Sequence, residues 1–184
     1  MQYDVTIGDV KRALPLCPIH EDLYIAAFIL LGDVALTGAC AKELLKIAPE
    51  HDVIITAEAK GITLAHEMAR LSGQSGYVVA RKAKKLYMVN PFTVRVHSIT
   101  TDFEQNLVLD EGDVALMRGK RVLIVDDVIS TGESLNAIEK LVETAGGNIV
   151  GRMAVFAEGN AQNRDDILFL QHLPLFNAKG EIVE

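Results

Sequence analysis

Tryptophan is absent from this 184-residue sequence, and aromatic residues make up only 5% of it. Cysteine is almost as scarce. Cys17 and Cys40 have neither metal-ligand spacing nor a disulfide framework, so we expect a reducing cytoplasm. The longest apolar run, residues 23–31, is far shorter than the roughly 20 residues of a membrane-spanning helix. The first residues also lack the basic-then-apolar order of a signal peptide. We therefore expect a soluble, cytoplasmic protein that has no membrane partner.

Positive charge is also in deficit, because 18 Lys and Arg residues face 25 Asp and Glu residues, for a net charge of −7. Such a balance argues against a surface built for nucleic acid, although a small cationic pocket remains compatible with it. The apolar fraction of 49% and the charged fraction of 23% are those of an ordinary globular protein. At this length, residues 1–184 are expected to form a single domain with a sizeable core.

Strand-like and helix-like patterns alternate through the middle of the chain. Expected strands cover residues 53–56, 77–80, 121–125 and 149–156, and expected helices cover 62–71, 134–144 and a segment that begins at Asp33 or Thr37 and ends near Ala48. This order predicts an α/β fold, a mainly parallel sheet flanked by helices on both faces.

The flanking segments are less regular. Tyr3, Val5 and Ile7 alternate with polar residues, and with residues 23–31 they predict an N-terminal hairpin or strand pair. Residues 81–106 begin with a basic cluster and then alternate weakly, which fits either a long mobile loop or an extended hairpin. The tail is apolar again at 167–170 and 173–176.

The stretch VLIVDDVISTGESL, Val122 to Leu135, places two carboxylates directly after an apolar run. Because ligands of open α/β sheets bind at the carboxyl ends of the strands, Asp126, Asp127 and residues 58–61 are expected at one such edge. A strand that simply ends at a helix N-cap is one alternative interpretation, but it explains only one of the acidic residues and one of the hydroxyl residues. A receiver-domain phosphorylation site would place the acidic pair near the domain start, with about 100 residues following, more than follow Asp127 here.

A phosphate cradle explains the stretch better. Its turn comprises Ser130, Thr131, Gly132, Glu133 and Ser134. Unpaired backbone N–H groups at the start of the helix favour an anion, and the glycine allows close approach. The sequence lacks the nucleotide P-loop pattern. Since ionised carboxylates accept hydrogen bonds from hydroxyls, a ligand with both a phosphate and a vicinal diol fits, as in a ribose 5-phosphate.

The thirteen residues from Val122 to Ser134 resemble the phosphoribosyl-pyrophosphate (PRPP) signature of type I phosphoribosyltransferases at every position. Thr56–Gly61 resembles the pyrophosphate loop of adenine and xanthine phosphoribosyltransferases, and residues 81–86 resemble the basic start of their mobile loop. The resemblance covers roughly residues 33–157. It implies the type I fold, with a core of about 33–157 and a small hood from about 1–32 and 158–184.

The resemblance also implies roles for the residues of the site. Asp126 and Asp127 would grip the ribose hydroxyls, and residues 130–134 would hold the 5-phosphate. The pyrophosphate loop would comprise Glu58, Ala59, Lys60 and Gly61, with Arg81, Lys82 and the mobile-loop residue Lys85 supplementing it. Mg²⁺ is expected mainly through the substrate phosphates rather than a protein cage. The implied substrates are PRPP and a purine base, handled by a homodimer.

Departures from the family pattern leave the base open. Adenine-specific relatives commonly carry arginine where Lys60 stands, and a Tyr-Glu pair where this chain reads Val96–Thr100. Hypoxanthine-guanine enzymes have an aspartate as the base where Ser130 stands, so no proton acceptor for the purine is identified. His66 is expected to be structural, and His97 is a candidate for a role. We expect an adenine phosphoribosyltransferase-like enzyme of purine salvage. The alternatives are a xanthine- or hypoxanthine-specific enzyme, a non-catalytic PRPP sensor and, more weakly, a pyrimidine enzyme.

Overall fold

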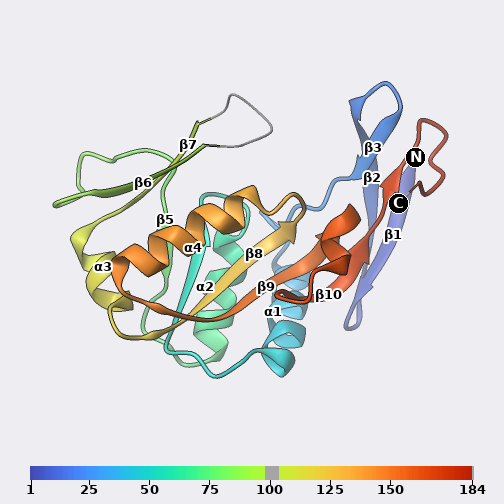
Figure 1. The fold of residues 1–184 in the computed structure, drawn as a ribbon. Coiled ribbons are helices and arrows are strands. Elements are labelled where there is room, and N and C mark those ends of the chain that lie inside the picture. The colour runs from blue at the N-terminus through green and yellow to red at the C-terminus, as the bar shows by residue number, and fades with distance from the viewer. Residues whose placement is uncertain (98–103, 184) are drawn as a thin grey trace.

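The computed structural model describes residues 1–97 and 104–183. Over these residues the chain forms a five-stranded parallel sheet, a four-stranded antiparallel sheet and a separate strand pair (Figure 1). In spatial order, the parallel sheet consists of β10 (Leu168–Leu173), β9 (Asn148–Glu158), β8 (Arg121–Ile129), β4 (Val53–Ala57) and β5 (Val78–Ala80). No helix of the described residues is long and apolar enough to cross a membrane.

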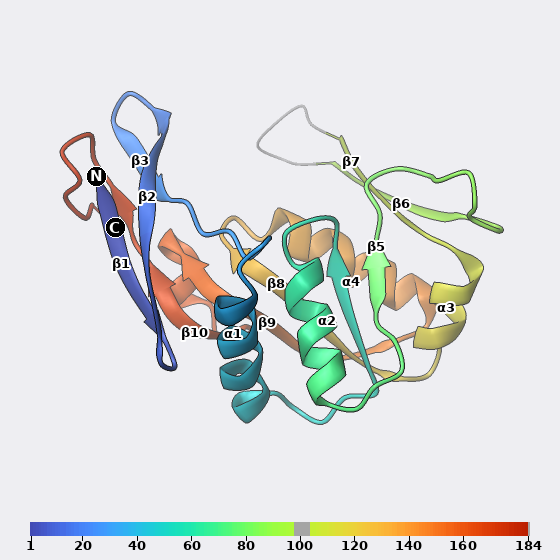
Figure 2. The same ribbon diagram turned by 180° about the vertical axis from the view of Figure 1, so that it is seen from behind.

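Helices cover both faces of the parallel sheet, as the sequence predicts (Figures 1 and 2). On one face lie α1 (Val34–Ile47) and α2 (Ile62–Leu71), and on the other lie α3 (Glu111–Met117) and α4 (Glu133–Ala145). Successive strand residues point to opposite faces, so Leu123 packs in the core under α1 and α2, whereas Ile124 packs under α4. The central strands are thus buried on both sides, which explains their unbroken apolar runs.

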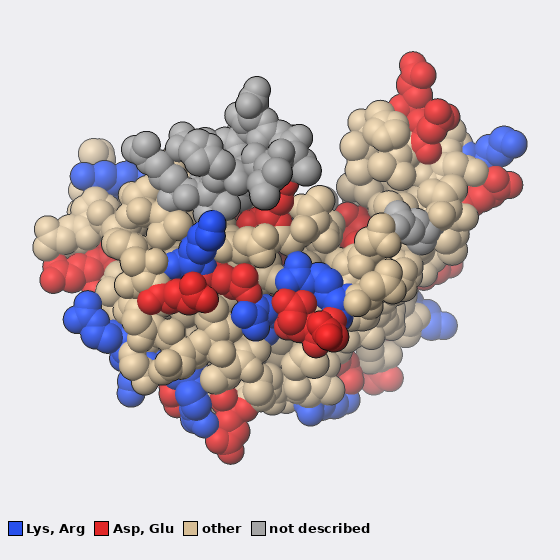
Figure 3. All heavy atoms as spheres, viewed as in Figure 1, with Lys and Arg blue, Asp and Glu red and all other residues tan. Residues whose placement is uncertain are grey.

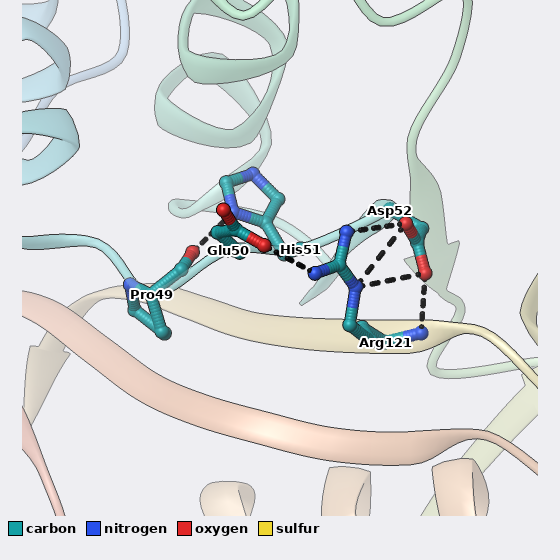
Figure 4. Close-up of polar contacts among 5 residues, drawn as sticks. All are labelled: Pro49, Glu50, His51, Asp52 and Arg121. Carbon is teal, nitrogen blue, oxygen red and sulfur yellow. Dashed lines mark hydrogen bonds and ion pairs between the residues drawn. The ribbon is translucent and has the colours of Figure 1, made fainter.

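Arg121 joins β4 to β8 at the amino-terminal edge of the sheet (Figure 4). Its guanidinium donates to Asp52 at 2.9 Å and to Glu50 at 2.7 Å, and its backbone N–H donates to Asp52 at 2.8 Å. The side-chain hydrogen bond from Arg121 lowers the pKa of Asp52 to about 2. These contacts hold the two strands side by side, and the opposite ends of the strands then meet at one edge.

The antiparallel sheet stands beside the parallel sheet and forms the hood. It contains β1 (Gln2–Ile7), β2 (Val10–His20), β3 (Leu23–Ala26) and β11 (Leu175–Phe176). Arg12 on β2 connects the hood to the core, because it donates to the two carboxylate oxygens of Asp33 at 2.6 and 2.9 Å. Asp33 also accepts from the Leu36 N–H and so caps α1. Of the two expected starts of this helix, Asp33 is correct and Thr37 is not.

The C-terminal segment contributes to both sheets. A short 3-10 helix, η1 (Gly159–Asn163), leads from β9 to β10, which pairs in parallel with β9 at the edge of the core sheet. Of the described residues after β10, the strand β11 pairs with β3 in the hood, and Ile182 forms an isolated bridge to Phe176. Gln171 on β10 donates to the Thr6 carbonyl at 2.7 Å and so links the two sheets.

The segment of residues 81–106 contains an extended hairpin arm rather than only a loop. β6 (Phe92–His97) pairs antiparallel with β7 (Glu104–Leu109), and Arg81 exchanges backbone hydrogen bonds with Val108 at 2.9 and 2.8 Å. The side chain of His97 lies outside the described residues, as does the stretch 98–103, so the predicted role of His97 stays a prediction.

Three expectations about secondary structure need correction. The expected strand 121–125 continues as β8 to Ile129, because parallel pairing with β9 extends beyond the apolar run. β2, the longer partner of β1, was missing from the expected elements. Helix α3 was also missing, although Asp110 and Asp113 form a reciprocal capping box at its start.

Candidate active site

A cavity of about 580 Å³ opens at the carboxyl-terminal edge of the parallel sheet, where β4 and β8 end. It is lined by Ala57, Glu58, Ala59, Lys60, Lys82, Asn106, Leu107, Asp126, Asp127, Val128 and Ser134. Segments far apart in the chain therefore meet here. The face shown in Figure 3 carries basic and acidic side chains interspersed. Within the cavity, Lys60 and Lys82 supply positive charge close to the two aspartates.

Asp126 and Asp127 lie inside β8, which continues beyond them to Ile129, and not in the loop that follows the strand. The ladder to β9 fixes their backbone, since Asp126 pairs with Ala154. The Asp127 N–H donates to Asp126 Oδ1 at 2.8 Å, and the Asp127 side chain is only 3% exposed. Burial, with the nearby negative charge of Asp127, raises the pKa of Asp126 above its usual range. The pair presents rigidly held hydrogen-bond acceptors to the cavity.

The loop after β4 brings a cation to these carboxylates. Lys60 Nζ lies 2.8 Å from Asp127 Oδ2, and the peptide bond between Glu58 and Ala59 is cis. Gly61 sits where a side chain does not fit, because a Cβ atom there would lie 2.3 Å from Thr56 Oγ1 and 3.1 Å from Asp126 Oδ1. The glycine thus lets the loop close down on β8.

Glu58 organises the basic segment that follows β5. The Lys82 N–H donates to Glu58 Oε2 at 3.0 Å, while Arg81 Nε and Lys85 Nζ lie 3.7 and 3.8 Å from Oε1. The hydrogen bond from Lys82, together with these charges, lowers the pKa of Glu58. Of the three cations, Lys82 lines the cavity. Glu58 therefore positions the basic residues next to the loop, a role that its sequence position alone does not reveal.

The turn of residues 130–134 forms the start of α4, with Gly132 as its N-cap. Gly132 has φ = +80°, a left-handed conformation that glycine adopts without strain. A hollow of about 60 Å³ is bounded by Asp126 and residues 128–135. Thr131 Oγ1 accepts a long hydrogen bond of 3.5 Å from the Glu133 N–H. The hollow combines hydroxyl groups with the positive end of a 13-residue helix, a combination that suits an anion.

Two residues that sequence reasoning missed belong to this region. Asn106 on β7 lines the cavity, and its Oδ1 atom is buried without a hydrogen-bond partner among the described residues. Glu158 at the end of β9 is partly buried, and burial raises its pKa although the charge of Lys60 opposes the shift. Neither Asn106 nor Glu158 lies in a sequence motif that would indicate a role in the site. His66, by contrast, stacks edge-on with Tyr77 at 5.8 Å, in keeping with its expected structural role.

The matched domain decides the family. The family model for the phosphoribosyl transferase domain matches residues 34–176, which is most of the chain. The chain belongs to the phosphoribosyltransferase family. The resemblance inferred from residues 122–134 is thereby confirmed.

Curated members of the family with similar sequences differ in the base they are named for. Adenine phosphoribosyltransferase from Rhodococcus jostii (strain RHA1) is 40% identical over 109 residues, which are 59% of this chain and 58% of that protein. Hypoxanthine/guanine phosphoribosyltransferase from Methanococcus voltae (strain ATCC BAA-1334 / A3) is 35% identical over 147 residues, which are 80% of this chain and 72% of that protein. The first alignment thus leaves much of each protein unmatched.

Solved structures of the family share the fold. Adenine phosphoribosyltransferase from Thermoanaerobacter pseudethanolicus superposes with a TM-score of 0.65 at 25% identity, covering 78% of this chain and 84% of that one. The enzyme from Saccharomyces cerevisiae, solved with an iminoaltritol bisphosphate and adenine, gives a TM-score of 0.63 at 19% identity and covers 92% of both chains. These similarities confirm the α/β fold with an added antiparallel hood.

Proposed function

We propose that this chain transfers the 5-phosphoribosyl group of PRPP to a purine base and releases pyrophosphate. The observation that carries the proposal is the shared cavity, which brings the buried acidic pair, the Lys60 loop and the start of α4 within one site. Membership of the phosphoribosyltransferase family agrees with this chemistry. Each part of the cavity corresponds to one part of PRPP.

The substrate would lie across the edge of the sheet. Asp126 and Asp127 accept hydrogen bonds from the two ribose hydroxyls, and residues 130–134 hold the 5-phosphate with backbone N–H and hydroxyl donors. Lys60 and Lys82 face the pyrophosphate, together with the backbone of the loop at Ala59. Arg81 and Lys85 add positive charge from the segment that Glu58 positions.

The reaction requires little covalent chemistry from the protein. A purine nitrogen forms a bond to the anomeric carbon as the bond from that carbon to pyrophosphate breaks, and the base loses its N–H proton. By analogy with glycoside hydrolysis, the ribose ring gains oxocarbenium character on the way. The site residues hold the ribose in place, stabilise charge on the leaving group and limit the access of water.

Mg²⁺ is part of the proposal. The described residues contain no cluster of three or more His, Cys, Asp or Glu side chains suited to a metal cage. Mg²⁺ is usually held by substrate phosphates together with one or two carboxylates. The carboxylates of Asp126 and Asp127, which line the cavity, would fit the second of these roles. When bound, Mg²⁺ would neutralise charge on the pyrophosphate.

Adenine is the base that we propose first. Adenine phosphoribosyltransferases are among both the curated relatives and the solved structures that this chain resembles. A hypoxanthine or guanine substrate is the second candidate, because the relative from Methanococcus voltae matches 80% of this chain. The hood lies beside the cavity end of the core and would cover the base.

A base-by-base assay tests the proposal. Purified protein with PRPP and Mg²⁺ is given adenine, hypoxanthine, guanine, xanthine, orotate or uracil separately, and nucleotide formation is measured by chromatography. We expect turnover with adenine. Turnover with another purine would move the assignment within the family. Failure with all bases, combined with PRPP binding in calorimetry, would contradict transfer and favour a PRPP sensor.

We also propose a cytoplasmic homodimer in which the partner's basic segment approaches the site. The support for the dimer is the family membership. The support for the cytoplasm is that Cys17 and Cys40 are both free thiols. Light scattering at micromolar concentration measures the mass, and a monomer would contradict the dimer.

A further inference from the structure

Arg164, directly after η1, packs its guanidinium against the turn at the start of α4. A Cβ atom placed on Gly132 would lie 2.5 Å from Arg164 Nη1, a distance shorter than any stable contact. Glycine at this position therefore serves the left-handed backbone and also makes room for a cation. Nothing in the sequence around Arg164 indicates this approach.

Asp166 fixes the orientation of the guanidinium. It accepts from Arg164 Nε at 2.9 Å and from Nη2 at 2.7 Å, a two-point pairing that leaves Nη1 directed at Gly132. Among the described residues no hydrogen bond of Nη1 is seen. The side chain is 29% exposed, so its position is set by packing as well as by Asp166.

The guanidinium of Arg164 adds positive charge next to the amino end of α4. The amino end of a helix carries partial positive charge, and Gly132 offers no side chain to cap it. The turn of residues 130–134 contains no Lys or Arg, so its donors are hydroxyls and backbone N–H groups. An anion seated in the turn would interact favourably with both the helix and Arg164. A phosphate dianion is the group that would use both sources of positive charge.

We propose that Arg164 is a binding residue for the 5-phosphate of the substrate, with Asp166 as the residue that positions it. Arg164 Nη1 extends the cradle of residues 130–134 from outside the signature sequence. This inference rests on the proposed function, because it takes that turn as the 5-phosphate site. It adds the cationic side chain that the turn itself lacks.

Calorimetry with three ligands tests the assignment: ribose 5-phosphate, PRPP and inorganic pyrophosphate, each with Mg²⁺. In Arg164→Gln we expect affinity for ribose 5-phosphate and PRPP to fall at least about tenfold, since a charge-assisted contact is lost, while pyrophosphate affinity is unchanged. Arg164→Lys should recover part of the loss, because it keeps the charge, and Asp166→Asn should lose less than Arg164→Gln. Arg70→Gln is the matched control, since Arg70 also has a two-point carboxylate partner, Glu67, but lies on α2.

The outcomes separate this inference from the proposed function. Unchanged affinity for ribose 5-phosphate in Arg164→Gln would overturn the role of Arg164. An equal loss for pyrophosphate would overturn it too, because a merely structural residue would disturb the whole cavity. If Arg164→Gln fails to fold, the affinity of Arg164→Lys for ribose 5-phosphate is compared with that of the unaltered protein instead, and an unchanged value would overturn the role of Arg164. For Asp166→Asn, unchanged affinity for ribose 5-phosphate together with full transfer activity would contradict the positioning role of Asp166. If the unaltered protein binds neither ribose 5-phosphate nor PRPP, the proposed function itself fails.

Discussion

The ammonium group of Lys60 lies 2.8 Å from the carboxylate of Asp127, an ion pair that ties the loop after β4 to the strand β8. The Asp127 side chain is 3% exposed and the Lys60 side chain is 52% exposed. The pair therefore places a buried negative charge against a cation that solvent still reaches. A ligand with hydroxyls for Asp127 and phosphate for Lys60 could replace the pair with two separate contacts.

Lys60→Ala is expected to destabilise the fold as well as weaken ligand binding. It leaves the buried Asp127 carboxylate without its cation, which should lower the free energy of unfolding by about 1–3 kcal/mol. The loss stays below that of a fully buried pair because water reaches Lys60. Urea denaturation measures it. Lys46→Ala, which breaks an exposed pair with Glu43, is the control and should change little; equal stability of the two variants would contradict the role of Lys60.

Asp126→Asn should stabilise the protein at alkaline pH. Burial raises the pKa of Asp126 in the folded state, so stability from its bound proton is present at low pH and is lost as the pH rises through the raised pKa. Asparagine mimics the neutral carboxyl group at every pH. The variant should therefore melt at a higher temperature than the unaltered protein at about pH 8, with the difference vanishing below about pH 3, where the carboxyl group is protonated in both the folded and the unfolded state. A melting-temperature difference of the same size at both pH values would argue against the raised pKa of Asp126.

Asp127→Asn tests the ribose contact. Losing a charged acceptor for a hydroxyl should weaken PRPP binding by about ten- to hundredfold, with the fold retained. Calorimetry gives the affinity, and circular dichroism checks the fold. Val125→Asp is the contrast, because Val125 is fully buried and an unpaired charge there should cost several kcal/mol of stability. Full PRPP affinity in Asp127→Asn would refute the assigned contact.

Gly61→Ala should disturb the cavity through packing. The added methyl group would meet Thr56 Oγ1 and Asp126 Oδ1, and relieving this overlap should cost about 1–3 kcal/mol and displace Lys60 from the acidic pair. Gly76→Ala is the matched control, since a Cβ atom there meets nothing within 4 Å. Thermal melting and PRPP titration of both variants give the comparison. A Gly61→Ala variant as stable as Gly76→Ala, with full affinity, would contradict the tight approach.

Local patterns predicted much of the fold correctly. The ends of α2 at Ile62 and Leu71 were predicted without error, because apolar spacing and flanking glycine are local signals. The extent of β8 was not, since its last residues, Asp126–Ile129, are strand only by pairing with β9. Whether a polar residue belongs to a strand depends on its pairing with the neighbouring strand, and a local sequence pattern does not contain that pairing. The same holds for β10, which is a strand of the core sheet through its pairing with β9.

The sequence by itself determined the family signature at residues 122–134 and the alternation that produces a parallel sheet, because both depend on neighbours in the chain. Only the tertiary structure decided which side chains share the site. It brought Lys60 to Asp127, set Glu58 among the basic residues and placed Arg164 against Gly132. Glu58 and Lys82 are 24 positions apart in the chain, and the members of the other two pairs are farther apart. Their contacts follow from strand order and sheet edge, which arise when distant apolar faces pack into one core.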